Sequence, residues 1–187
     1  LRNFSPSSLA RNQILDISSP YLFGFYLASS FGGEYNYINP DKTDLYLVKK
    51  YSSKLKFTMK YSADSADATS LSFSDNSFSH IISISVIEHI NGTGDSEAIK
   101  EMWRVLKPNG ILILTFPVAK TFEEEFSDKD TYGLNVQQIK EKFFFQRVYD
   151  ENSIKERLLD KIKDFTILSK EIFGESESGF YQSYSER

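Results

Sequence analysis

The distribution of apolar and polar residues along the chain changes repeatedly between a strand-like and a helix-like period. Short apolar or alternating runs predict strands at residues 12–17, 34–39, 55–61, 79–86 and 111–116. Helical spacing between these runs predicts helices at residues 21–31, 41–51 and 95–106. Strands that alternate with helices through short turns are typical of an α/β fold. We therefore expect a Rossmann-like, doubly wound and mostly parallel sheet with helices on both faces.

The pattern weakens after Pro117. Residues 121–142 are charged and irregular, which favours a lid or a substrate-facing insertion. The aromatic run 143–145 is expected to cover the sheet edge or, alternatively, to form a wall of the substrate site. Residues 153–162 have helical spacing, and residues 164–173 predict a late strand.

We find no linker that would divide the 187 residues into two domains. The chain begins with Leu1 rather than Met, so we expect a trimmed piece of a longer protein, and truncation of the fold at its ends stays open. We expect a single domain over residues 1–187, with a core at 12–118, a substrate or lid region at 119–150, and a C-terminal helix and strands at 151–187.

Composition narrows the class of protein. The 22 basic and 26 acidic residues give a net charge of −4, so charge provides no argument for a nucleic-acid or membrane partner, and we expect neither. No apolar run is long enough to span a bilayer, and no secretory signal precedes the first strand, so we expect a cytoplasmic protein. The absence of cysteine excludes a thiolate site, and with only His80 and His89 we expect no metal site.

Ligands of doubly wound sheets bind beyond the carboxyl ends of the strands, where the strand order reverses. The residues that directly follow the predicted strands are therefore the candidates for a binding site. These are residues 16–21 after the first strand, Asn39 after the second, Asp67 and Ala68 after the third, residues 84–89 at the end of the fourth, and Pro117 after the fifth.

One stretch of the chain carries a family resemblance. Its text reads DATSLSFSDNSFSHIISISVIEHI and then GDSEAIKEMWRVLKPNGILILTFPV. It resembles the middle block of class I S-adenosylmethionine-dependent methyltransferases of the type 11 kind, and EMWRVLKPNGILILTFPV is its most specific part. A weaker similarity extends back to residues 14–16, so the resemblance covers residues 12–118. It implies the class I methyltransferase fold and S-adenosyl-L-methionine as the cofactor.

The resemblance also implies a set of cofactor-binding positions. An acid at the end of the second strand usually accepts both ribose hydroxyls, and an acid followed by a small residue brackets the adenine. The positions of this sequence that match the cofactor site are Asp16, Ser18, Ser19, Pro20, Tyr21, Asn39, Asp67, Ala68 and Ser85.

The chain departs from the family at two of these places. Ser18, Pro20 and Leu22 stand where the family has the glycines of its first loop, and Pro20 removes an N–H group. Asn39 stands where the family has an acid, and a neutral acceptor in place of a charged one costs on the order of 1 kcal/mol. We expect weak cofactor binding or a changed binding mode.

Methyl transfer is an in-line displacement, so catalysis rests mainly on alignment, and a general base is needed only for some acceptors. His89 is the candidate base, and Glu88 beside it could orient His89 or bind the acceptor. We expect a small-molecule or glycan-like acceptor held by residues 116–149, whereas the sequence does not indicate an oligomeric state.

Other interpretations of the same residues stay open. Asp16 could cap a helix or a turn, Asn39 could form an Asn-Pro turn, Asp67 could form an Asx turn, and His89 could be structural. The whole chain could be a catalytically inactive binding or assembly domain of the same fold. A nucleotide-sugar or dinucleotide enzyme is a third alternative, disfavoured because the chain has no glycine-rich phosphate loop.

Overall fold

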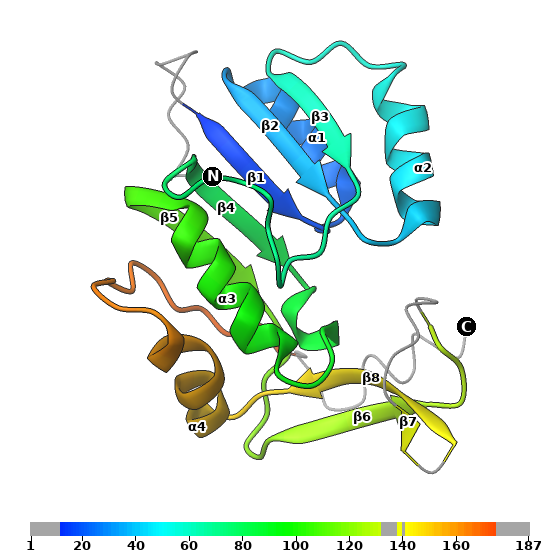
Figure 1. The fold of residues 1–187 in the computed structure, drawn as a ribbon, viewed down its shortest axis with the longest axis vertical. Helices are drawn as coiled ribbons and strands as arrows, with labels where there is room; N and C mark the ends of the chain where they lie inside the picture. The colour runs from blue at the N-terminus through cyan, green and yellow to red at the C-terminus, as the bar shows by residue number, and fades with distance from the viewer. Residues whose placement is uncertain (1–11, 132–137, 140, 175–187) are drawn as a thin grey trace.

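A computed structural model describes residues 12–131, 138–139 and 141–174 of the chain (Figure 1). Its main sheet has five parallel strands in the order β3-β2-β1-β4-β5. The chain proceeds outward from β1 to β3 and then returns to β4, so the strand order reverses between β1 and β4. The strands are β1 (Gln13–Ile17), β2 (Glu34–Ile38), β3 (Lys60–Asp64), β4 (Phe78–Ile84) and β5 (Leu106–Thr115). This topology confirms the predicted doubly wound α/β fold.

Helices cover both faces of this sheet, as predicted. α1 (Tyr21–Ser30) and α2 (Lys42–Ser52) pack on one face, and α3 (Gly94–Val105) packs on the other (Figure 1). Neighbouring residues of β1 point to opposite faces, so Ile14 packs with α1 and α2 whereas Leu15 packs with α3. Close packing of α1 on β2 depends on Gly24, because an added Cβ atom would lie 2.6 Å from the Tyr35 hydroxyl oxygen.

Two strand boundaries differ from the sequence prediction. The third strand was expected at residues 55–61, but β3 begins at Lys60. Phe57 lies before the strand, where its ring packs against Phe25 and Tyr61, so its apolar character reflects packing of a loop. The last predicted strand was expected to begin at residue 111, but β5 begins at Leu106. Its first half contains Asn109 with φ 61°, and the pairing with β4 shifts register there.

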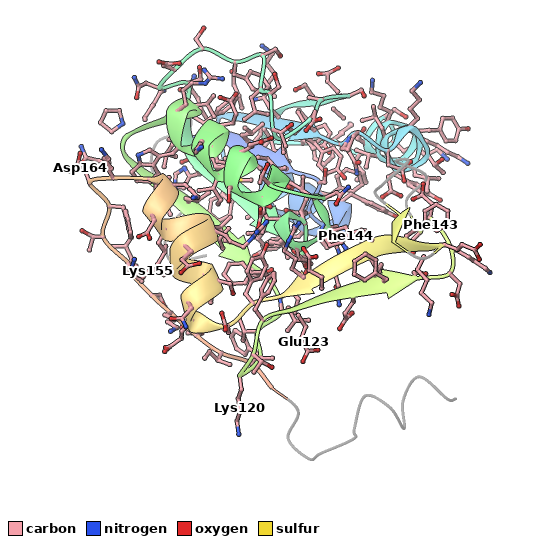
Figure 2. All side chains as sticks on the ribbon, turned by 60° about the horizontal axis from the view of Figure 1, so that its bottom comes forward. Lys120, Glu123, Phe143, Phe144, Lys155 and Asp164 are labelled. Carbon is pink, nitrogen blue, oxygen red and sulfur yellow. The ribbon has the colours of Figure 1, made fainter. Side chains whose placement is uncertain are left out.

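The chain after Pro117 forms a second, antiparallel sheet of three strands in the order β6-β8-β7. Its strands are β6 (Glu123–Ser127), β7 (Gln138–Ile139) and β8 (Lys142–Val148). The aromatic run 143–145 therefore lies in β8 and does not cover the edge of the main sheet, which corrects that expectation. Figure 2 shows β6 and β8 side by side below α3, with Glu123 near the base of β6 and Phe144 on β8.

The C-terminal part of the described chain is helical and then extended. α4 (Glu151–Ser153), η2 (Ile154–Leu158) and η3 (Leu159–Lys161) follow one another without a break, which confirms the predicted helix at 153–162. The late strand predicted at 164–173 is wrong, since those residues form no strand. Their apolar side chains are largely exposed, so the strand-like pattern lacks a partner strand. Residues 175–187, where further strand was expected, lie outside the described residues.

None of the helices within the described ranges is both long and apolar enough to cross a membrane.

Candidate functional site

The loops that follow β1, β2 and β4 meet at the carboxyl edge of the main sheet, at the reversal of strand order. The structure divides this edge into two halves. Asp16 lies near the end of β1, Ser18 and Ser19 follow β1, and Asn39 follows β2. Ser85, Glu88 and His89 follow β4.

Asp16 supports the loop after β1 from inside the protein. Its side chain is fully buried, its Oδ1 accepts a hydrogen bond from the Ser19 N–H at 3.0 Å, and the Tyr35 hydroxyl donates to Oδ2. Burial raises the pKa of Asp16 to about 6, and the bonds from Tyr35 and Ser19 oppose that rise. Both carboxylate oxygens are therefore used within the protein.

The two serines of this loop connect β1 to the strands on either side. Ser18 has φ 54°, a left-handed conformation that favours glycine, and its N–H and hydroxyl both donate to the Ile38 carbonyl, at 2.8 and 3.0 Å. The Ser19 hydroxyl oxygen accepts from the Ile84 N–H at 3.0 Å. Ser18 thus has a backbone conformation that favours glycine, and the hydroxyl groups of Ser18 and Ser19 add bonds that glycine would lack.

Pro20 and Tyr21 begin α1. Pro20 is the N-cap residue and provides no side-chain hydrogen bond to the helix. The Tyr21 ring stacks on the Tyr51 ring with a centroid separation of 6.2 Å and an angle of 15° between the planes. The start of α1 is therefore fixed by aromatic packing on α2.

The Asn39 side chain holds the turn between β2 and α2. Its Nδ2 donates to the Tyr37 hydroxyl at 2.9 Å, and its Oδ1 accepts from the Asp41 N–H at 2.8 Å. An amide oxygen has two acceptor positions and an amide nitrogen two hydrogens. These two bonds therefore leave one acceptor position and one hydrogen of Asn39 for a further bond.

Asp67 forms an Asx turn, and Ala68 packs into the core. Asp67 is exposed, and its Oδ1 accepts from both the N–H and the hydroxyl of Thr69 at 2.8 Å. Its second oxygen takes no part in those two bonds. The Ala68 side chain packs with Ile17 and Ile38, which brings the Asp67 loop to the same edge as β1 and β2.

The other half of the edge contains an open hollow of about 520 Å³. Ser85 lies at its rim, with φ 53° and an N–H that donates to the carbonyl and hydroxyl oxygens of Thr115. The short helix η1 (Ile87–His89) follows and brings Glu88 and His89 to the wall of the hollow. The residues that line it are Ser85, Glu88, His89, Thr115, Phe116, Pro117, Phe145, Gln146 and Phe173.

The protonation of the His89 ring follows from its contact with β8. Its Nδ1 lies 2.8 Å from the Phe145 carbonyl oxygen, which can only accept, so Nδ1 carries a hydrogen. Burial lowers the pKa of His89, and the Phe145 carbonyl opposes that change. In the neutral ring the lone pair is therefore on Nε2, which is the nitrogen that can accept a proton.

The Glu88 carboxylate is buried but only partly bonded. Its side chain is 2% exposed, its Oε1 lies 3.9 Å from His89 Nε2, and its Oε2 has no hydrogen-bond partner within the described residues. Burial raises the pKa of Glu88 to about 7, opposed by backbone N–H groups of Glu88 and Val86. An acid with this pKa titrates close to neutral pH, as groups that exchange protons with a substrate commonly do.

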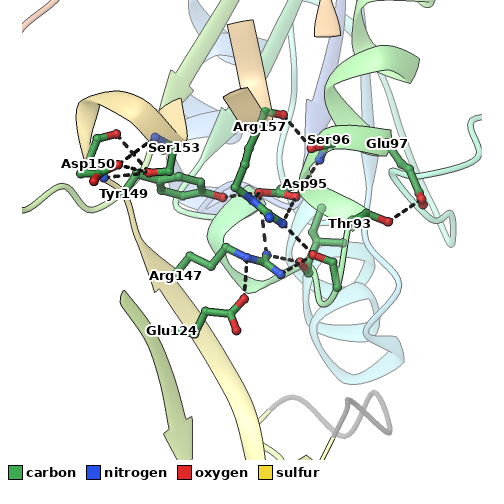
Figure 3. A network of polar contacts seen from close by, with 12 residues as sticks. Thr93, Asp95, Ser96, Glu97, Glu124, Arg147, Tyr149, Asp150, Ser153 and Arg157 are labelled. Atoms are coloured by element: carbon green, nitrogen blue, oxygen red, sulfur yellow. Dashed lines mark hydrogen bonds and ion pairs between the residues drawn. The ribbon is translucent and has the colours of Figure 1, made fainter. Parts of the chain in front are cut away.

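A buried polar network fixes β8 against α3 (Figure 3). At its centre is Asp95, fully buried at the start of α3, whose carboxylate accepts from Arg157 at 2.7 and 2.8 Å and from the Tyr149 hydroxyl at 3.0 Å. The fully buried Arg147 on β8 donates to Glu124 at 3.1 Å and to the carbonyl oxygens of Ile90 and Gly92 at 2.6 Å. These bonds hold β8, and with it the Phe145 carbonyl, beside η1.

Sequence reasoning missed this network and the contact between Phe145 and His89. The residues that these contacts join are far apart in the chain, so no local sequence pattern indicates them. The one signal in the sequence was the presence of the polar residues Arg147, Tyr149 and Asp150 directly after the aromatic run 143–145.

Comparison with known families decides the class of protein. The model of a family described as methyltransferase domain matches residues 18–114, more than half of the chain. The chain belongs to this methyltransferase family. The matched segment includes Ser18, Asn39, Asp67, Ser85, Glu88 and His89, and membership implies S-adenosylmethionine as the methyl donor.

Solved structures share the fold of this methyltransferase domain. A SAM-dependent methyltransferase from Methanosarcina mazei is similar with a TM-score of 0.58 and 18% identity, over 86% of this chain and 81% of that one. A putative sarcosine dimethylglycine methyltransferase from Galdieria sulphuraria gives 0.50 and 22%, over 56% of this chain and 39% of that one. The [4+2]-cyclase SpnF gives 0.51 and 19%, over 81% of this chain and 50% of that one. No curated protein matches the chain.

The methyltransferase domain thus spans 39% and 50% of the length of the second and third of these structures. One of the three is the [4+2]-cyclase, so this fold is not confined to methyl transfer.

Two residues that follow β2 and β3 in the methyltransferase domain keep acceptor positions suited to the donor's polar groups, although Asn39 offers fewer than an acidic residue would. Asn39 has one acceptor position left after its internal bonds, and Asp67 has a second carboxylate oxygen. Together they can accept from a ribose hydroxyl and from an adenine amino group.

Proposed function

We propose that this domain transfers a methyl group from S-adenosylmethionine to a small-molecule or glycan-like acceptor bound in the hollow. The observation that carries the proposal is the position of the partly bonded Glu88 carboxylate beside His89, in the wall of a hollow beyond β4 and β5. Burying an acid without a full set of donors destabilises a folded protein, so the arrangement favours a functional role.

The donor is proposed to lie along the β1 and β2 half of the edge and to reach the hollow at Ser85. Ser18, Ser19, Pro20 and Tyr21 form the loop against which it lies, and Asp16 holds that loop from behind. Asn39 accepts from one ribose hydroxyl, and Asp67 and Ala68 flank the adenine. When bound, S-adenosylmethionine supplies a methyl group on a positively charged sulfur.

His89 and Glu88 are proposed to prepare the acceptor. His89 Nε2 takes a proton from the acceptor atom, while the Phe145 carbonyl keeps the ring in the orientation and tautomer that this requires. Glu88, whose Oε1 lies 3.9 Å from His89 Nε2, helps to orient the His89 ring. Alignment of acceptor and methyl group supplies most of the rate acceleration.

A second candidate is a non-catalytic domain of the same fold, and one observation favours it. The polar side chains of the first loop and of Asn39 already have partners within the protein, and Pro20 has no N–H to offer. A domain that has lost the ability to bind the methyl donor would keep such internal bonds, because they stabilise the fold.

Calorimetric titration of the chain with S-adenosylmethionine and with S-adenosylhomocysteine separates the two candidates. The enzyme predicts micromolar binding of at least one of them, and weaker binding by Asp67→Ala. Asp128→Ala, which removes an exposed acid directly after β6, is the matched control. A cooperatively melting protein that gives no heat would favour the non-catalytic domain. If the double variant Ser18→Gly with Pro20→Gly then bound S-adenosylmethionine, this would show that only the loop after β1 has diverged from the family.

A further inference from the structure

A basic stretch of the chain begins in α2, one of the two helices that cover the same face of the main sheet. Between Asp44 and Asp64 the sequence contains five lysines and no acid, although the chain as a whole has a net charge of −4. Two of these lysines, Lys49 and Lys60, reach acids at 3.9 and 3.4 Å in exposed pairs. The net charge therefore conceals a local excess of positive charge.

The other three lysines of this stretch are exposed and form no ion pair within the described residues. They are Lys50, Lys54 and Lys56. Lys50 lies one helical turn after Tyr46, on the side of α2 opposite to its buried residues. The Lys54 N–H donates to the Tyr51 carbonyl at 3.0 Å, so the chain continues to turn just beyond the end of α2. These three ammonium groups are available to an anionic partner.

Large apolar side chains are exposed among these lysines. Lys50 Nζ lies 5.9 Å from the ring centroids of both Tyr46 and Tyr51. On α1, Leu22 and Tyr26 lie one turn apart and are 72% and 51% exposed. Because α1 and α2 pack on the same face of the sheet, their outward sides form one surface. We call it the lysine–tyrosine surface, and its residues are Leu22, Tyr26, Tyr46, Lys50, Tyr51, Lys54, Leu55 and Lys56.

This combination of side chains fits the surface of a membrane that contains anionic lipids. A lysine close to such a membrane raises the affinity about fivefold through its attraction to the headgroups. Tyrosine rings favour the boundary between headgroups and acyl chains, and exposed aliphatic side chains gain free energy when they enter it.

Nucleic acids are also polyanions, but this surface lacks the features that they select. Proteins bind single strands in charged grooves and often use arginine, whose planar group contacts phosphates and stacks on bases. The lysine–tyrosine surface is the outward side of two helices, and the chain has no arginine between residues 12 and 103. The exposed Leu22 and Leu55 side chains have no π system on which a base could stack.

We propose that the lysine–tyrosine surface binds this domain to membranes that contain anionic lipids. Its lysines lie against the headgroups, and its leucine and tyrosine side chains lie at the boundary with the acyl chains. This inference goes beyond the proposed methyl transfer and does not depend on it, because none of these residues lines the hollow or belongs to the proposed donor site. A chain that fails to bind S-adenosylmethionine should still bind such membranes.

Co-sedimentation of the whole chain with lipid vesicles tests the inference. We expect vesicles of phosphatidylserine and phosphatidylcholine in equal parts to bind at least about tenfold more tightly than phosphatidylcholine alone, and added salt to weaken that binding. Lys50→Glu with Lys54→Glu should weaken binding to the mixed vesicles at least about tenfold. Lys100→Glu with Lys120→Glu, which changes the net charge equally at exposed lysines outside this surface, should retain it. Equal binding to the two kinds of vesicle, or an equal loss in the two variants, would overturn the inference.

A second pair of variants tests the apolar part of the surface. Leu22→Ser with Leu55→Ser leaves every charge in place and should weaken binding to the mixed vesicles about tenfold. Leu168→Ser with Ile172→Ser, two exposed apolar residues of the C-terminal segment, should retain it. A loss confined to this control would assign membrane binding to the C-terminal segment and overturn the inference. A single-stranded RNA that binds more tightly than the mixed vesicles, and loses its affinity in Lys50→Glu with Lys54→Glu, would also overturn it.

Discussion

Two buried acids stand at the same edge of the sheet and differ in their partners. Asp16 ends β1 and Glu88 follows β4, both are nearly inaccessible to solvent, and burial raises the pKa of the first to about 6 and of the second to about 7. Asp16 has a donor for each oxygen, whereas Glu88 Oε2 has none within the described residues. Similar burial therefore accompanies two bonding states: the fold satisfies both oxygens of Asp16 but leaves one oxygen of Glu88 unsatisfied, which is why we propose a functional role for Glu88 and not for Asp16.

The contrast extends to the two halves of the edge. In the β1 and β2 half, Ser18, Ser19 and Asn39 form hydrogen bonds with neighbouring strands and turns, so bonds within the fold hold this half together. In the β4 and β5 half, the wall of the hollow is completed by β8, which belongs to another sheet. The shape of the hollow, which we propose as the acceptor site, thus depends on how the second sheet is held.

The largest effect is expected from removing the centre of the network that holds the second sheet. Asp95→Ala leaves Arg157 and Tyr149 without their carboxylate partner and should lower the free energy of unfolding by about 3–5 kcal/mol. Urea unfolding measures this loss. Asp160→Ala removes the acid of an exposed ion pair with Lys155 on the C-terminal helix, and it should not measurably change the free energy of unfolding. Equal effects of the two substitutions would show that the network does not hold β8.

Glu88→Gln is expected to have a smaller effect on the free energy of unfolding, and to raise it rather than lower it. Because its folded pKa of about 7 exceeds the usual value of 4.5, the folded chain binds this proton more tightly than the unfolded chain. The free energy of unfolding should therefore fall as pH rises from about 4.5 to 7, and Glu88→Gln should remove that fall. At pH 8 the variant should be more stable by about 2 kcal/mol.

Chemical unfolding across this pH range measures the change at Glu88. The separate fall expected from Asp16, between its usual pKa of 3.8 and about 6, should persist in Glu88→Gln and serves as an internal control. A variant that is less stable than the unmodified chain at pH 8 would show that Glu88 stabilises the fold, and the comparison with Asp16 would fail.

Asp16 can be given the bonding state of Glu88 by one substitution. Tyr35→Phe removes the donor to Asp16 Oδ2 and leaves a buried oxygen without that bond, which should lower the free energy of unfolding by about 1–2 kcal/mol. The pKa of Asp16 should rise further, because the Tyr35 bond now lowers it. Tyr61→Phe is the matched control, since the Tyr61 hydroxyl is buried without a partner in the described structure and its loss should not destabilise the protein.

Much of the main sheet could be predicted because its signals are local. β4 and the second half of β5 are apolar on both faces, and Pro20 and Gly33 mark the start of α1 and the turn after it. The rule that ligands bind beyond the strand ends also placed Glu88 and His89 beside a hollow.

The remaining features depend on contacts between distant residues. Sequence spacing could not predict the hydrogen bond between His89 and the Phe145 carbonyl or the salt bridges of Asp95, because these contacts join residues more than fifty positions apart. It also could not tell that Phe57 packs in a loop or that residues 164–173 lack a partner strand, because an apolar residue has the same sequence pattern in each of these settings.

The smallest effect is expected in the segment where the sequence prediction was wrong. Leu168 is 71% exposed, so Leu168→Ala should change the free energy of unfolding by less than about 0.5 kcal/mol. Ile81→Ala, in the fully buried centre of β4, should cost about 2–5 kcal/mol, since it removes the same kind of side chain from the core. Urea unfolding of both variants makes the comparison. A loss at Leu168 close to that at Ile81 would mean that residues 164–173 pack in solution as the strand that their pattern predicts. Phe173 would then lie in that strand, and the part of the hollow's wall that it forms would have a different position.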